Sequence, residues 1–184
     1  MRIDQRRFLI SSQGILAVFL FYVVFSGQLP AADPVSKTAL RKAVSKGAEL
    51  IVGMQESLGP DGAVLNEWPY EGVYRVRSPR SRKGIIPIGY RVGGTAICSI
   101  ALLKTPAYRS SKAAQAAVRR GRDFIVASLK DPLLSASFKG SYDVRGWGHA
   151  YALQFLLEAR ESGKLGKKRA YDEHILWLVA ALEE

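Results

Sequence analysis

The sequence predicts an all-α fold of helical hairpins, and three observations support this prediction. Two blocks of sequence recur, the apolar residues are spaced as on one face of a helix, and no segment of note has the period of a strand. The block "AVSKGAELIV" at 43–52 returns as "AVRRGRDFIV" at 117–126, and "RVGGTAICSIALL" from Arg91 returns as "RGWGHAYALQFLL" from Arg145. The offsets of 74 and 54 residues differ by 20, so the first of two related units carries an insertion, which contains the basic segment 73–87.

Residues 1–32 have the parts of a secretory signal. Arginines precede an uncharged run over residues 8–25, and small residues follow it. The strongly apolar core of this run is short for a membrane-spanning helix, which needs about 20 residues. No clean Ala-x-Ala cleavage site is present, so both a cleaved signal and an uncleaved membrane anchor through residues 8–25 stay open. We expect an exported, periplasmic or otherwise extracytoplasmic protein whose folded domain is residues 33–184.

The composition limits the partners of this domain. The net charge of +11 at pH 7 falls to +9 when residues 1–32, with three arginines and one aspartate, are left out. An exported basic chain meets anionic lipid, acidic polysaccharide or solvent, so nucleic acid is not expected as a partner. Cys98 is the single cysteine, which rules out an internal disulfide, and stability must therefore come from packing.

Each unit is predicted to be a pair of helices with different surroundings. The first helices, near residues 35–54 and 114–129, have one apolar stripe that includes Gly47 and Gly121. We expect these glycines to allow another helix to approach closely. The second helices, which begin near Arg91 and Arg145, are apolar on most sides, as is typical of a helix surrounded by neighbours. This alternation predicts an outer and an inner layer, and "YDEHILWLVAALEE" at the end of the sequence begins a third unit.

The stretch "KGAELIVGMQESLGPDGAVLNEW" at 46–68 contains a motif that recurs in the second unit. It resembles the QW motif of the terpenoid cyclase and protein prenyltransferase superfamily, which runs basic-Gly, aromatic-Leu, Gln, Gly, Trp. The residues that match are Lys46, Gly47, Leu50, Ile51, Gln55, Asp61, Gly62 and Trp68. The second unit has a weakened copy, with Leu129 at the Gln position, whose other residues are Arg120, Gly121, Phe124, Ile125 and Trp147.

The resemblance spans residues 35–184 and implies an α/α toroid, in which hairpins stack into concentric barrels. This chain would form an arc of about two and a half hairpins. Another α-hairpin solenoid is the alternative, although the periods of TPR and HEAT repeats, about 34 and 40–47 residues, fit less well than 54. We expect Gln55 and Trp68 to be structural, because a Gln amide can satisfy carbonyl groups and an indole offers a flat surface with one N–H for the same joint.

The motifs that give this superfamily its activities are absent. The Asp-rich DxDD acid of the cyclases is missing, and Cys98, His149 and His174 lack zinc-binding spacing, so no metal and no cofactor are expected. The first expectation is therefore a non-catalytic binding or scaffolding domain. One alternative is a cyclase-like enzyme in which Asp143 is the acid and His149 orients it. Another is a fragment of a longer toroid protein.

The starts of the second helices form the candidate binding site. Helix N-termini present unpaired amides, and the offset of 54 places Thr95 and His149 at equivalent points on the same rim. Aromatic and polar side chains at a cavity mouth can hold a lipid or a carbohydrate. The alternative is structural, with Thr95 capping its helix and His149 bonded to a carbonyl. The predicted ligand-binding residues are Trp68, Tyr70, Glu71, Tyr90, Arg91, Thr95, Arg145, Trp147 and His149.

Two further surfaces are predicted to meet partners. The basic segment 73–87 either is a solvated loop or contacts anionic lipid or another polyanion, at about 1 kcal/mol per basic residue. The basic residues concerned are Arg75, Arg77, Arg80, Arg82 and Lys83. In addition, an arc of repeats leaves an uncovered apolar face, so we expect a protein partner or self-association at its open end.

Overall fold

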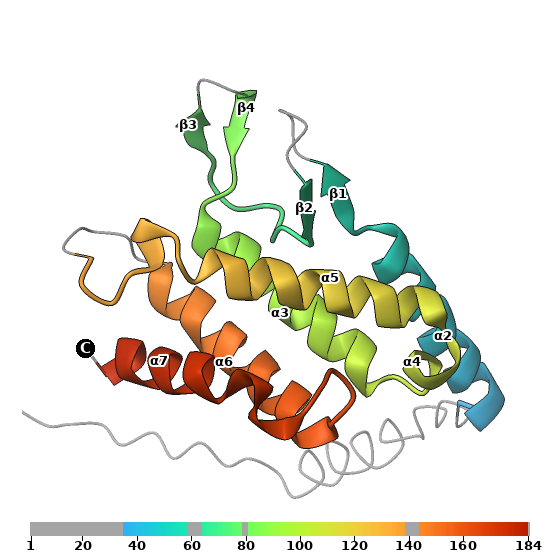
Figure 1. Cartoon of the computed structure of the whole chain (residues 1–184). Helices are drawn as coiled ribbons and strands as arrows, with labels where there is room; N and C mark the ends of the chain where they lie inside the picture. The colour runs from blue at the N-terminus through green and yellow to red at the C-terminus, as the bar shows by residue number, and fades with distance from the viewer. Residues whose placement is uncertain (1–34, 59–63, 79–80, 139–143, 184) are drawn as a thin grey trace, which may run out of the picture. The chain divides into compact units, whose positions relative to one another are not determined.

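The fold is all-α, as predicted, in the part of the chain that the computed structural model describes (Figure 1). The described residues are 35–58, 64–78, 81–138 and 144–183. The predicted signal or anchor at 1–32 lies outside them. Residues Thr38–Glu184 form one compact unit. Its helices are α2 (Lys37–Gly53), α3 (Ile88–Lys104), α4 (Ala107–Ser110), α5 (Lys112–Ser128), α6 (Arg145–Ser162) and α7 (Asp172–Glu183), with 3₁₀ turns η1 (Pro132–Leu134) and η2 (Lys168–Tyr171).

The helices have the expected positions in the sequence and different degrees of burial. α2 and α5 begin the two predicted units, and α3 and α6 complete them. α3 packs along both α5 and α6, and α7 packs on α6 (Figure 1). α3 is buried along most of its length, which explains why its sequence is apolar on most sides. Ser111 starts α5, because its side chain accepts a hydrogen bond from the backbone N–H of Ala114 at 3.1 Å.

The two second helices approach closely at their N-terminal ends. A Cβ added to Gly148 on α6 would lie 3.0 Å from Cα of Gly89 on α3, and a Cβ added to Gly89 would lie 2.5 Å from the carbonyl oxygen of Val144. Such distances leave no room for a side chain at either position. The starts of α3 and α6 therefore form one continuous rim, and residues in the first turns of both helices become neighbours.

Two short β-hairpins interrupt the helical pattern, contrary to the expectation of no strands. β1 (Glu56–Leu58) pairs with β2 (Val64–Glu67), and β3 (Val76–Ser78) pairs with β4 (Ser81–Ile85), both antiparallel. The predicted insertion at 73–87 thus contains the second hairpin. Gly84 has φ 74°, and a Cβ there would lie 2.6 Å from the carbonyl oxygen of Val76, so this position requires glycine. Strands of three to five residues are too short to show a period of two.

Candidate functional site

Gln55 and Trp68 connect the first unit to the second. Gln55 Nε2 donates to the carbonyl oxygens of Ala117 at 2.9 Å and Asn66 at 3.2 Å, and its Oε1 accepts from Arg120 Nε at 3.0 Å. Trp68 Nε1 donates to the carbonyl oxygen of Ile51 at 2.6 Å. Arg120 is the basic residue of the second motif copy, so each unit's motif contributes to the same joint. This arrangement supports the structural role expected for Gln55 and Trp68.

The segment that follows β2 is fixed to α3 by buried polar contacts. Thr95 Oγ1 accepts from the backbone N–H of Trp68 at 2.9 Å and donates to the carbonyl oxygen of Arg91 at 2.8 Å. Glu67 is buried, and both of its carboxylate oxygens accept from Arg91 Nε at 2.9 Å. Burial raises the pKa of Glu67, and the charge and hydrogen bond of Arg91 oppose this rise. Thr95 and Glu67 therefore position the backbone from which the next aromatic residues project.

Five aromatic side chains meet at the rim, and we call them the aromatic cluster. Tyr70 and Tyr90 are stacked with ring centroids 6.2 Å apart, and Trp147 contacts both rings edge-on at 5.4 and 5.3 Å. Tyr74 adds an edge contact to Tyr90 at 5.8 Å, and Tyr151 adds one to Trp147 at 4.9 Å. The members come from the segment after β2, the first turn of α3 and the first two turns of α6.

Two glycines on α3 leave room for the residues of the aromatic cluster to pack against this helix. A Cβ on Gly93 would overlap the ring of Trp147, and a Cβ on Gly94 would lie 2.5 Å from the carbonyl oxygen of Trp68. Gly93 therefore makes room for the indole, and Gly94 allows the segment before Tyr70 to lie against the helix. Close packing therefore explains why both positions are glycine.

The aromatic cluster is partly open to solvent and has charge at its edge. Tyr70 and Tyr74 are each 49% exposed, whereas Trp147 is half-buried. Glu71 and Arg75, which lie beside the two exposed tyrosines in the sequence, form an ion pair at 2.9 Å. A surface of contacting rings with charged groups next to it can hold a molecule that has both apolar and hydroxyl-bearing faces.

Other predicted ligand-binding residues point away from this surface or are fully engaged. His149 is buried, and its Nε2 lies 2.9 Å from the carbonyl oxygen of Leu134, which matches the structural alternative. A carbonyl can only accept, so Nε2 carries the proton, and burial lowers the pKa of the ring. Arg145 donates to the carbonyl oxygens of Ser135 at 2.9 Å and Phe138 at 3.1 Å. Trp68 and Thr95 are buried in the joint.

The structure thus brings together Tyr70, Tyr90 and Trp147 from the predicted set and adds Tyr74 and Tyr151. Tyr151 follows Trp147 by four residues on one helix, and this spacing was a usable signal for a shared face. Tyr74 had no such signal, because it reaches the aromatic cluster through the course of a non-helical segment. Asp143, the candidate catalytic acid, lies outside the described residues.

No known protein family, curated protein or solved structure matches this chain. The resemblance to the terpenoid cyclases and protein prenyltransferases therefore stays a prediction from sequence. Among the described residues, no three His, Cys, Asp or Glu side chains gather closely enough to hold a metal ion. The helices in that part of the chain also include none that is long and apolar enough to cross a membrane.

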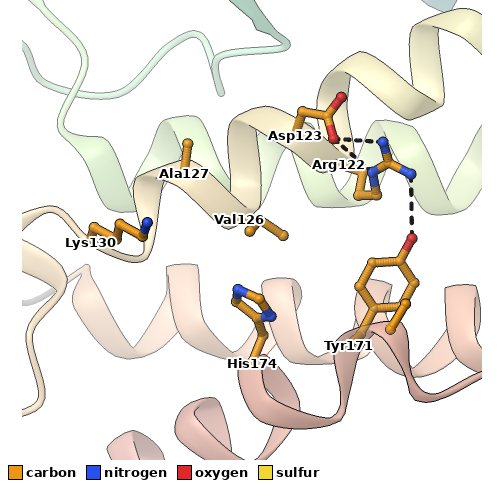
Figure 2. Close-up of a pocket in the computed structure, with 8 residues that line it drawn as sticks. Arg122, Asp123, Val126, Ala127, Lys130, Tyr171 and His174 are labelled. Carbon is orange, nitrogen blue, oxygen red and sulfur yellow. Dashed lines mark hydrogen bonds and ion pairs between the residues drawn. The ribbon is translucent and has the colours of Figure 1, made fainter.

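A pocket lies between α5, η2 and α7 (Figure 2). It has a volume of about 360 Å³ and was not predicted. Figure 2 shows Arg122 directed at both Asp123 and Tyr171, and the guanidinium also donates to the carbonyl oxygen of Leu165 at 3.3 Å. This arginine is therefore already paired, which leaves Lys130 and His174 as the groups available to a ligand. These two groups do not define one ligand chemistry, so the aromatic cluster is the better candidate.

Proposed function

We propose that this chain is an exported, non-catalytic helical-repeat domain that binds a carbohydrate at the aromatic cluster. The observation that supports this proposal is the chain of ring contacts from Tyr74 through Tyr90 and Trp147 to Tyr151, with Tyr70 half-exposed on it. The C–H faces of a sugar ring pack well on aromatic rings, and its hydroxyl groups need polar partners nearby. The ion pair of Glu71 and Arg75 offers such partners.

A carbohydrate fits this surface better than a lipid chain does. A hydrocarbon chain gains its binding energy from burial of its whole apolar surface, at about 25 cal/mol per Å². The aromatic cluster is instead a half-exposed surface with a charged pair beside it. Tyrosine also supplies a hydroxyl next to its apolar ring, which suits a ligand of mixed polarity.

In this proposal, the helical repeats hold the site in place. An arc of an α/α toroid would place the second helices of its units side by side, and α3 and α6 pack in this way. The cyclase-like alternative depends on His149 as an orienting group. That ring is buried and engaged with the carbonyl of Leu134, so we favour binding without catalysis.

Isothermal titration of soluble, uncharged oligomers of glucose and of N-acetylglucosamine tests the proposal. We expect saturable binding that Tyr70→Ala and Tyr74→Ala each weaken about tenfold, which corresponds to about 1.4 kcal/mol. Leu133→Ala is the matched control, because Leu133 is a similarly exposed apolar side chain that is not a member of the aromatic cluster. Binding by no oligomer in the series, or equal binding by the tyrosine variants, would contradict the proposal.

A further inference from the structure

The two outer helices, α2 and α5, are equivalent in sequence and different in burial. On α5 the apolar stripe of Ala114, Ala117, Val118 and Ile125 is fully buried, and α5 packs on α3. The offset of 74 assigns the equivalent positions on α2 to Leu40, Ala43, Val44 and Ile51. There the first three residues are exposed, and Leu40 has 57% of its surface accessible.

The motif glycines show the same contrast. A Cβ on Gly121 would lie 2.9 Å from Ser99 Oγ and 3.0 Å from the ring of Trp68, so a neighbour covers this side of α5. Among the described residues, and leaving out the backbone of its own helix, no atom would lie within 4 Å of a Cβ on Gly47. α2 therefore has the same sequence pattern as the packing surface of α5. In the described part of the chain, no helix covers this surface of α2. We call this surface the open stripe, and its residues are Leu40, Ala43, Val44, Gly47, Leu50 and Met54.

A second set of exposed apolar residues lies on α6 and α7. Leu103 on α3 is 2% exposed, whereas its equivalent on α6, Leu157, is 36% exposed. On α7, Leu176 is 69% exposed, and Val179 is exposed beside it. We call this surface the acidic edge, because exposed carboxylates accompany its apolar residues. Its residues are Leu157, Glu161, Glu173, Leu176, Val179 and Glu183.

The two surfaces are complementary in charge. Arg41, Lys42 and Lys46 accompany the open stripe, with Glu49 as the one acid of α2, whereas α7 has no Lys or Arg. We propose that two copies of this chain associate head to tail, with the open stripe of one copy packed on the acidic edge of the next. A symmetric contact between two α2 helices would bring like charges together, and so would a contact between two α7 helices. A contact between different surfaces either closes into a ring or continues as a filament.

Two other possible occupants, residues 1–32 and a lipid surface, match the open stripe less well. Residues 1–32 carry three arginines and one aspartate, so their charge has the same sign as that of α2. A lipid surface would satisfy the charges of α2, but the equivalent stripe on α5 is covered by protein side chains and backbone. A second copy supplies both the apolar surface and the carboxylates.

Sedimentation velocity over a range of concentrations tests the contact. The sample is the protein purified from a host that exports it, with any processing of the N-terminus complete. We expect a concentration-dependent assembly that Lys42→Glu with Lys46→Glu weakens at least about tenfold, as does Glu173→Lys with Glu183→Lys. Combining the four changes reverses both sides, and we expect association within about threefold of the original. Lys112→Glu, an exposed reversal on α5, is the control and should leave association unchanged.

Crosslinking distinguishes a head-to-tail contact from a symmetric one. In a Cys98→Ser background, one preparation carries Leu40→Cys and another carries Leu176→Cys. Oxidation should give a dimer only after the two preparations are mixed. A monomer at all concentrations, a dimer from the Leu40→Cys preparation alone, or an assembly indifferent to the charge reversals would each overturn the proposal. A monomer that binds vesicles of anionic lipid through α2 would also overturn it.

Discussion

Gln55 Nε2 donates to the carbonyl oxygen of Ala117 at 2.9 Å, although 62 residues separate the two in the sequence. The same amide bonds the carbonyl oxygen of Asn66 and its Oε1 accepts from Arg120, so one side chain holds α2, the first hairpin and α5 together. Ala117 lies within α5 rather than at its end. The joint therefore depends on one amide that supplies both donors and an acceptor.

Gln55→Ala should lower the free energy of unfolding by about 2 kcal/mol. The change removes the donors of two carbonyl groups and the acceptor of Arg120 in a half-buried place, and a hydrogen bond to a charged group contributes about 1.5–3 kcal/mol. Chemical denaturation followed by circular dichroism measures the effect. Gln154→Ala, at an exposed position on α6, should change stability by less than about 0.5 kcal/mol. Equal effects of the two substitutions would show that the joint is dispensable.

Gly47→Ala and Gly121→Ala should have effects of opposite sign. Both glycines lie inside helices, where alanine is favoured by up to about 1 kcal/mol. At Gly47 the new methyl group meets open space, so the variant should be more stable by a fraction of this amount. At Gly121 it would crowd Ser99 and Trp68, and the variant should lose about 1–3 kcal/mol. Thermal unfolding at low protein concentration measures both, and a loss at both positions would contradict the contrast between α2 and α5.

His149 should make stability depend on pH. Burial lowers the pKa of this ring, so the unfolded chain binds more protons than the folded chain just below the usual histidine pKa of 6.5. The free energy of unfolding should therefore decrease as the pH falls through this range, by no more than about 1.4 kcal/mol per pH unit from this group.

His149→Gln is the matched variant for this prediction. Its amide can donate to the carbonyl oxygen of Leu134 without titrating. The difference in unfolding free energy between the two proteins should shift in favour of the variant between about pH 7 and pH 5. Burial raises the pKa of Glu67, and this group titrates in both proteins, so its effect cancels in the difference. A difference that is constant over this range would disprove the assignment of a buried neutral ring.

Cys98 should react slowly with alkylating reagents in the folded protein. Burial in α3 raises the pKa of its thiol to about 11, and the thiolate is the reactive form. With iodoacetamide near pH 8, we expect alkylation at least about tenfold slower than in the same chain under denaturing conditions. Mass spectrometry of timed samples measures both rates. Equal rates would place Cys98 at an accessible position and contradict the packing of α3.

The five longer helices among the described residues could be predicted from the sequence because each has enough residues to show apolar positions at helical spacing, whereas α4 has only four residues. The joint between the two units was also accessible, since Gln55 and Trp68 occupy the Gln and Trp positions of the QW-like motif, which were expected to connect neighbouring units. The directions of the Thr95 and His149 side chains could not be predicted from the sequence. A helix that is apolar on most sides does not show which way its few polar residues point, and here both point into the core.

The hairpins and the aromatic cluster depend on contacts that the local sequence pattern does not predict. β3 and β4 are stabilised by pairing with each other, which a period of two over three to five residues does not reveal. Tyr74 joins the aromatic cluster only because the segment after β2 lies on α3, where Gly94 lets the backbone approach. The open stripe and its equivalent on α5 have the same sequence pattern, and only burial distinguishes them.

The indole N–H signals of the three tryptophans give the most direct test of the account. In an ¹⁵N-labelled sample titrated with the oligosaccharides, the signal of Trp147 in the aromatic cluster should shift and saturate. The signal of Trp68, whose N–H is bonded to Ile51 in the buried joint, should stay in place as an internal control. If Trp147 does not respond while the protein is folded, or if Trp68 and Trp177 shift as much as Trp147, the aromatic cluster is not the binding site.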